Sequence, residues 1–282
     1  MRPRPFLHWF LVGSLMMTAA SIPCPARAQQ SDWTFMVAPY AWAFGLEGDT
    51  GVGDRVASID ESFLDIMDQS DSIVALQGHA EVQYRRIGAF VDGAYADVSY
   101  SPGASAERRF FDAEIDADVE EKILFVEAGA FYRALDEQRL WGDPEAGAGG
   151  LLNADILFGA RYTNLDISVD ADLTVNQEEF EANFEGDHDW VDPFIGVRTN
   201  LRLADDIDLS LRGDVGGVVT GSDFAWNVQG LLGYRFLMFG AAATAWGGYR
   251  ALGQDYDDHS GDREFTWDMT LHGPIIGMSV TW

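Results

Sequence analysis

Three absences limit what this 282-residue chain can be. Its one cysteine, Cys24, lies near the N-terminus, so we expect no disulfide to hold the fold together. Lys122 is the only lysine, and the other basic residues are arginines, which suit multidentate ion pairs in confined places. After residue 28 no run approaches the roughly 18 apolar residues of a membrane helix. If the chain enters a membrane, it must do so as a closed barrel, because lipid tolerates no unpaired backbone edge.

The N-terminal segment has the pattern of a secretory signal peptide. Residues 1–4 are a basic start, residues 6–22 are an apolar run, and residues 26–28 (Ala-Arg-Ala) form a small-residue cleavage site. Pro23 stands before Cys24, where a lipoprotein signal has a small residue, so we expect no lipid anchor. We therefore predict that residues 1–28 are removed and that residues 29–282 form one outer-membrane barrel domain.

Acidic residues greatly outnumber basic ones. The chain has 46 Asp and Glu against 18 Lys and Arg, a net charge of −28. Without the three arginines of the signal segment, 15 basic residues remain against 46 acidic ones, and the net charge becomes −31. A chain with this charge repels nucleic acid and suits a surface rich in cations.

Ten segments have the length and composition of tilted membrane strands. In 151–165, for example, Leu152 and Ile156 face one way while Asp155 and Arg161 face the other. We predict an all-β, up-and-down antiparallel transmembrane β-barrel of about ten strands, with eight to twelve allowed by uneven loop lengths. The segments are approximately 33–46, 72–86, 88–100, 117–134, 151–165, 191–203, 206–220, 224–237, 240–253 and 264–282.

The two faces of these strands favour a membrane barrel over a soluble β-sandwich. A sandwich has a solvated polar face that is usually rich in lysine, whereas here arginines stand among carboxylates and amides. The apolar faces carry aromatic rings near strand ends, as membrane-interface girdles do: Tyr84, Tyr162, Trp226, Tyr234, Tyr249 and Trp282. The first strand has aromatic residues on both faces and Pro39 within it, so we assign it no orientation and expect a bulge.

The end of the chain alternates apolar and small residues, with Ile276, Met278, Val280 and Trp282 on one face. This pattern resembles the C-terminal strand of Gram-negative outer-membrane β-barrels, which the barrel-assembly machinery reads. Residues 37–42, followed by Gly45 and Gly48 and then by residues 59–67, are similar to the N-terminal part of a family of uncharacterised proteobacterial outer-membrane β-barrel proteins. The resemblance implies the fold and a place in the outer membrane, with lipid and lipopolysaccharide as partners, but no activity.

The polar strand faces predict an ionic lumen. A ten-stranded barrel is close to the width that side chains can fill, and charges inside it must be paired or hydrated. We expect a structural salt-bridge network rather than a narrow, porin-like channel in which excess arginine favours small anions. The residues assigned to it are Glu81, Arg85, Asp92, Glu127, Arg133, Asp155, Arg161, Arg198, Arg202, Arg212, Asp214, Arg235 and Arg250.

Two histidine arrangements are weaker candidates for catalysis. His79 and Glu81 share a strand face about 7 Å apart, but the spacing places no nucleophile beside them. An outer-rim hydrolase using Asp257, Asp258 and His259 is disfavoured because neighbours in a strand point to opposite faces. We expect neither to be an active site.

The outer loops carry the acidic residues. Residues 166–190 are expected to continue a hairpin beyond the membrane, with carboxylates facing one another across it. Ca²⁺ or Mg²⁺ would relieve their repulsion through oxygen ligands. The candidate ligands are Asp166, Asp170, Asp172, Glu179 and Glu181, and the alternative is a solvated acidic loop.

The only helical signal lies between Asp60 and Asp68. Asp60 or Ser62 can cap it, and Phe63, Ile66 and Met67 form a short apolar stripe. Because so short a helix is marginal alone, we predict that it packs against the barrel mouth as a lid or partial plug.

Taken together, these features predict a non-catalytic structural or surface-interaction barrel with an acidic outer face. A narrow channel is the first alternative, and an outer-membrane hydrolase is the second.

Overall fold

A computed structural model gives the fold and describes residues 32–52, 55–100, 103–108, 111–140, 150–175, 178–258 and 265–282. For several stretches, including 111–119, 171–175 and 178–185, it describes the backbone alone. The signal-peptide prediction lies outside the described residues. None of the described helices is long and apolar enough to cross a membrane.

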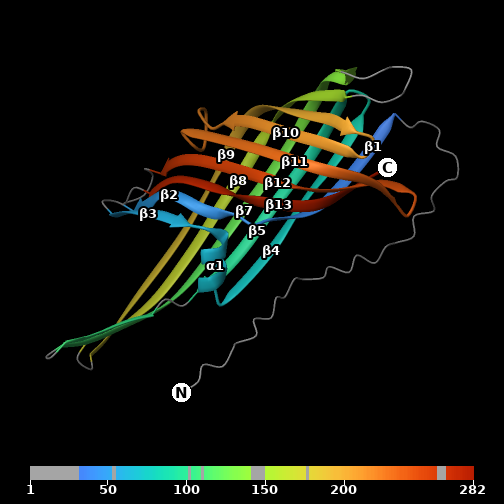
Figure 1. The fold of residues 1–282 in the computed structure, drawn as a ribbon. Coiled ribbons are helices and arrows are strands. Elements are labelled where there is room, and N and C mark those ends of the chain that lie inside the picture. The colour runs from blue at the N-terminus through green and yellow to red at the C-terminus, as the bar shows by residue number, and fades with distance from the viewer. Residues whose placement is uncertain are drawn as a thin grey trace.

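Ten antiparallel strands close into a barrel, as the alternation predicted (Figure 1). Each pairs with its neighbour in the chain, and β1 pairs with β13 to close the cycle, so that Val37 lies opposite Val280. The barrel strands are β1 (Trp33–Trp42), β4 (Ser72–Tyr84), β5 (Ile87–Tyr100), β7 (Phe111–Arg139), β8 (Leu151–Val175), β9 (Glu178–Ala204), β10 (Ile207–Gly216), β11 (Phe224–Met238), β12 (Ala241–Asp258) and β13 (Phe265–Thr281).

The two ends of the barrel differ. At one end, which we call the turn end, lie both β1's first residue and Trp282, with tight turns at 85–86, 205–206 and 239–240. At the other, the hairpin end, β7, β8 and β9 run far past the remaining strands (Figure 1). The pairing of β8 with β9 continues from Asp166 opposite Asp187 to Val175 opposite Glu178, which confirms the predicted hairpin over 166–190.

Three further strands lie outside the barrel cycle. β2 (Gly45–Val52) and β3 (Arg55–Glu61) form a hairpin whose β2 pairs with β13, and β6 (Gly103–Arg108) pairs with β7. The ten predicted strands leave 47–71 as a loop, and that prediction is wrong for this hairpin. Its pairing depends on close approach: Gly48 has φ +145°, and a Cβ there would stand 2.1 Å from the carbonyl oxygen of Asp268.

The apolar faces of the barrel strands point outward. Ile156, Val197 and Leu232 are 43, 58 and 55% exposed, whereas Arg161 on the opposite face of β8 is fully buried. A soluble sandwich would bury the first three and expose the arginine. The predicted orientation of the two faces is therefore confirmed.

Aromatic rings gather at the turn end on the outer face. Trp33 stacks near Phe35 and Tyr84, with centroids 6.3 and 4.8 Å away, and Phe35 lies 6.3 Å from Trp282. Toward the hairpin end, the hydroxyl of Tyr95 donates to Asp97 at 3.1 Å. Aromatic residues thus lie toward both ends of the outward apolar surface, and Tyr95 has a polar partner there.

The first strand can be oriented after all. Its even-numbered residues from Met36 to Trp42 are the more buried ones, and its odd-numbered residues face outward. The register with β13 is the same before and after Pro39, so the expected bulge is absent from β1. Instead, β1 parts from β4 beyond Pro39, and the Gln77 side chain takes over the ladder by bonding the Trp42 N–H and C=O at 2.5 and 3.2 Å. Missing backbone pairing is therefore replaced by an amide side chain.

The interior contains two buried apolar clusters. Toward the hairpin end, Trp42, Phe125, Trp190 and Trp267 belong to a large buried cluster. A smaller cluster comprises Phe90, Phe131, Leu157 and Phe194. It lies among the polar residues, since Leu157 stands between the inward-facing Asp155 and Arg161 on β8.

We predict that Gly48→Ala detaches the β2–β3 hairpin from β13, because the added Cβ meets backbone and the φ angle disfavours side chains. Hydrogen exchange of the amides in 45–52 should quicken at least about tenfold, or roughly 1.4 kcal/mol of local opening. Gly213→Ala is the control, since nothing lies within 4 Å of its added Cβ. Unchanged exchange in Gly48→Ala would contradict the proposed close approach.

Candidate functional site

Ten charged side chains fill the middle of the barrel, and we call them the lumen network. Strand register sets them side by side: Asp92 lies opposite Glu127, Glu127 opposite Arg161, and Asp155 opposite Arg198. Alternation then points them all inward. The lumen network comprises Glu81, Asp92, Glu127, Arg133, Asp155, Arg161, Arg198, Arg212, Asp214 and Arg250.

Glu127 lies at the centre of this network. It accepts from Arg161 Nε at 2.9 Å, from Arg250 Nη2 at 2.9 Å and from Arg212 Nη2 at 2.6 Å. Arg161 also donates to Asp214 at 2.8 Å, and both residues are buried. Hydrogen bonds to this many partners offset much of the free energy that these charges lose on leaving water.

A second branch extends toward the turn end. Asp155 accepts from Arg133 Nε at 2.9 Å and from Arg198 Nη2 at 2.9 Å, and Arg198 reaches across the lumen to Glu81 at 2.6 Å. His79 joins the branches, with Nδ1 3.2 Å from Asp92 and Nε2 3.6 Å from Glu81. The ion pairs therefore bridge strands on opposite sides of the barrel.

Aromatic rings also contact the arginines that pair with carboxylates. The guanidinium carbon of Arg198 lies 4.8 Å from the Phe131 ring centroid, and that of Arg250 lies 4.7 Å from the Trp42 centroid. Arg212 sits over Phe90 at 5.5 Å. Each of these contacts adds cation–π attraction in a site shielded from water.

Three arginines that we assigned to the lumen lie elsewhere or at its edge. Arg85 is in the β4–β5 turn, where it is exposed and donates to Asp32 at 2.9 Å, so its inward assignment is wrong. The alternation of β4 ends at Tyr84, and a turn residue need not follow it. Arg202 and Arg235 form a separate group with Asp208, at 3.7 and 3.0 Å, toward the turn end.

The centre of the lumen network is shielded from solvent. Arg161, Glu127 and Asp214 are all at most 4% exposed, although the barrel mouths lie on either side of them. Within the lumen network, five arginines match five carboxylates. A cavity of about 220 Å³ opens on the turn-end side, where Tyr40 and Trp246 line it beside network residues.

The described histidines contact carboxylates or a tyrosine, and His188 Nδ1 lies 3.8 Å from Asp258. Among the described residues no serine hydroxyl hydrogen-bonds to a histidine; His79 joins the lumen network, and His272 bonds to Tyr249 at 2.7 Å. The rim candidate His259 lies outside the described residues. Where the structure describes the chain, the arrangement that a nucleophilic hydrolase needs is missing.

The structure only partly covers the cation candidates in the long hairpin. Backbone register puts Asp172 opposite Glu181 and Asp170 opposite Asn183. The side chains of Asp172, Glu179 and Glu181 lie outside the described residues, so the five-ligand arrangement stays a prediction. No group of three metal-binding side chains occurs among the described residues, which include Asp166 and Asp170.

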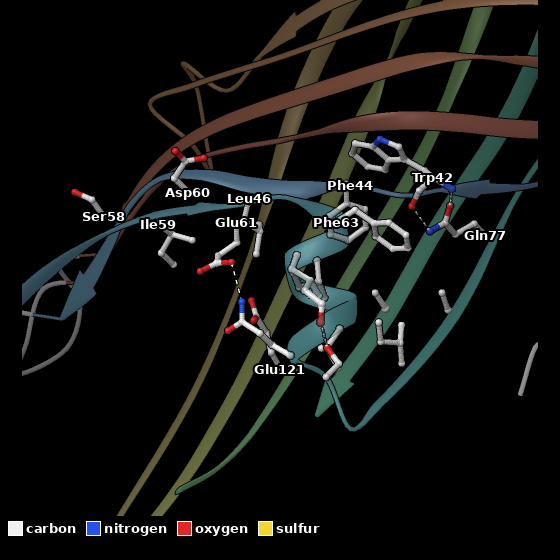
Figure 2. A pocket seen from close by; sticks show the side chains of 18 residues that line it. Trp42, Phe44, Leu46, Ser58, Ile59, Asp60, Glu61, Phe63, Gln77 and Glu121 are labelled. Atoms are coloured by element: carbon white, nitrogen blue, oxygen red, sulfur yellow. Dashed lines mark hydrogen bonds between the residues drawn. The ribbon is translucent and has the colours of Figure 1, made fainter. Parts of the chain in front are cut away.

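The predicted helix is present as α1 (Phe63–Gln69). Ser62 is its N-cap, and Ser62 and Asp65 form a reciprocal capping box. Phe63 and Ile66 face a cavity of about 330 Å³ at the hairpin end, whereas Met67 does not line it. Figure 2 shows α1 standing between the β2–β3 hairpin and the barrel wall.

The cavity beside α1 is mostly apolar. Inward-facing residues of β4, β5 and β7 form one wall, and the β2–β3 hairpin and α1 form the other (Figure 2). Sequence reasoning missed Glu121, which lines it, although the residue has the same strand parity as Ile123 and Phe125. The lining residues are Trp42, Phe44, Leu46, Ser58, Ile59, Asp60, Glu61, Phe63, Ile66, Gln69, Ser70, Ile73, Ala75, Gln77, Ala96, Val98, Glu121 and Ile123.

Comparison with known proteins adds no assignment. No protein-family model matches the chain, and no curated protein matches it. Among solved structures, Ail, the attachment invasion locus protein of Yersinia pestis, is 9% identical with a TM-score of 0.27, covering 89% of this chain and 99% of Ail. A Pseudomonas aeruginosa FadL homologue is 10% identical with a TM-score of 0.27, covering 89% of each chain. At these scores, neither protein's role bears on this one, and the family resemblance stays a prediction.

We predict that Arg161→Gln lowers the free energy of unfolding by about 3–5 kcal/mol, because it leaves Glu127 and Asp214 buried with fewer cationic partners. Urea unfolding in lipid vesicles measures the change. Arg85→Gln is the matched control, and its exposed pair with Asp32 should contribute nothing measurable. Equal stability of the two variants would contradict a structural role for the lumen network.

We predict that acid uncaps α1. Hydrogen bonds from the Ser62 hydroxyl and backbone N–H lower the pKa of Asp65 below its ordinary value of 3.8. A lowered carboxyl pKa means that the cap's contribution is present above pH 3.8 and is lost as the pH falls through the lowered value. The amide NMR signals of residues 62–66 should follow this titration. In Asp65→Asn they should not move over the same range.

Proposed function

We propose that this protein is an integral outer-membrane β-barrel with a closed lumen, and that it acts as a structural or surface-interaction protein through its hairpin end. The observation that carries the proposal is the burial of a charge-balanced lumen network inside a barrel whose outer face is apolar.

The outer face supports placement in a lipid bilayer. Exposed aliphatic residues continue around the barrel, including Val74, Ile195, Leu211 and Ile276. Monomers in water rarely expose a continuous apolar belt of this kind, whereas a membrane barrel requires one. The outward charges Asp97, Lys122 and Asp166 stand at one level of register and mark where the belt ends toward the hairpin end.

The orientation follows from the connections. Bacterial barrels keep short turns and both termini on the periplasmic side and send long loops outward. The turn end of this barrel would then face the periplasm, and the extended β7–β9 sheet would stand outside the cell. Export by the signal segment of residues 1–28 fits the same scheme.

The long sheet supports a surface role. Its strands carry many carboxylates, as the sequence of 166–190 shows, and extend the backbone ladder of the barrel beyond the membrane level. An acidic projection of this kind can bind cations, or partners with basic surfaces, by complementary charge. The candidate Ca²⁺ or Mg²⁺ ligands lie on the same hairpin.

A narrow channel is the second candidate, and the 220 Å³ cavity on the turn-end side favours it. For solutes to pass, the pairs that Glu127 and Asp155 make with arginines would have to separate. That separation would expose unpaired charges in a confined space and would cost several kcal/mol per charge.

Planar-bilayer conductance tests the proposal. Purified protein should add no current above that of protein-free bilayers. A variant with glycine at Glu127, Arg161, Asp214 and Arg250 removes both signs together and should conduct, which shows that insertion and the assay work. Discrete single-channel currents from the unaltered protein would overturn the closed lumen.

A further inference from the structure

The cavity at the hairpin end is shaped like a binding site for a small molecule. At about 330 Å³ it falls within the range of ligand pockets, and apolar side chains with a few polar groups line it. Trp42, Phe44 and Phe63 supply aromatic surface from three different segments. The β2–β3 hairpin and α1, which are not part of the barrel, form one wall of this cavity.

The charges in the cavity have one sign. Asp60, Glu61 and Glu121 line it, and none of the described lining residues is basic. Glu61 is occupied, because it accepts from Gln69 Nε2 at 3.1 Å. Gln77 is also occupied, with both its amide atoms on the Trp42 backbone. The polar groups therefore favour a cationic head and disfavour a carboxylate one.

Of the other two carboxylates, Asp60 is exposed to water and Glu121 is half-buried. Glu121 stands on the inward face of β7 beside the cavity, and no hydrogen bond or ion pair is made by it within the described part of the chain. It borders the cavity and is half-buried, yet enough protein surrounds it for burial to raise its pKa. It lies at the level of Lys122, outside the apolar belt. A bound cation would relieve the cost of this uncompensated charge.

We propose that this cavity binds a small apolar amine, with its hydrocarbon or aromatic part among Trp42, Phe44 and Phe63 and its ammonium group on Glu121. The strongly negative outer surface supports the same ligand class, because it raises the local concentration of cations at the mouth. Binding at this site does not depend on whether ions can pass through the lumen.

Three probes with one shape and different heads test the proposal: 4-phenylbutylamine, 4-phenylbutanol and 4-phenylbutyrate. Binding is measured by titration calorimetry with the full barrel in zwitterionic nanodiscs, and heats from empty nanodiscs are subtracted. The amine should bind at least about tenfold more tightly than the alcohol, and the carboxylate should not bind measurably.

Neighbouring residues give matched variants. Glu121→Gln should weaken the amine at least about tenfold and leave the alcohol within about twofold. Glu120→Gln should change neither, because Glu120 does not line the cavity and pairs with Lys122 at 2.8 Å. Ala75→Phe fills the cavity and should abolish binding of both probes while Glu121 is retained.

Three results would overturn the proposal. They are equal binding of carboxylate and amine, amine binding that survives Ala75→Phe, and amine binding that is equally strong in Glu121→Gln. The unfolding midpoint of each variant in urea is measured beside the calorimetry, so that a loss of binding counts only for a folded barrel.

Discussion

The pairing of arginines with carboxylates inside the barrel is the interaction on which the rest of the structure depends. A ten-stranded barrel encloses a space that side chains must fill, and alternation sends every second residue into it. This sequence fills the middle with charges, which are stable there only if each finds a partner. Glu127, with three arginine partners, shows how completely that condition is met.

The barrel interior differs on the two sides of the lumen network. Toward the turn end, the lumen contains a cavity of about 220 Å³ lined by network residues and Trp246. Toward the hairpin end, the lumen network is covered by a buried apolar cluster that includes Trp190 and Trp267. Beside that cluster, α1 and the β2–β3 hairpin enclose the cavity with Glu121. If the lumen is closed as proposed, a ligand in this cavity would not pass inward.

The alternation of side chains along each strand made much of the barrel and its lumen network predictable. A period of two assigned Arg161 and Arg198 inward and Ile156 outward, and the lengths of the alternating segments gave the ten strands. The same alternation wrongly placed Arg85 inward, because β4 ends at Tyr84, the residue before it. Alternation could not reveal the β2–β3 hairpin, because β2 contains three glycines and shows no two-residue pattern of apolar side chains. Its pairing partner, β13, is also about 220 residues away in the chain, as with Gly51 opposite Thr266. Glu121 was overlooked because it stands in the acidic run with Glu120, although its parity matched the lumen.

The central claim is that alternate residues of each strand meet lipid while the others are enclosed, and spin-label accessibility along 191–198 tests it most directly. If the signal segment is removed as predicted, no cysteine remains to interfere with single labels. Labels at positions 191, 195 and 197 should collide with oxygen dissolved in the bilayer, and labels at 192, 194 and 198 should be shielded from both oxygen and a water-soluble nickel reagent. A nickel reagent that reaches the odd positions would contradict the membrane barrel.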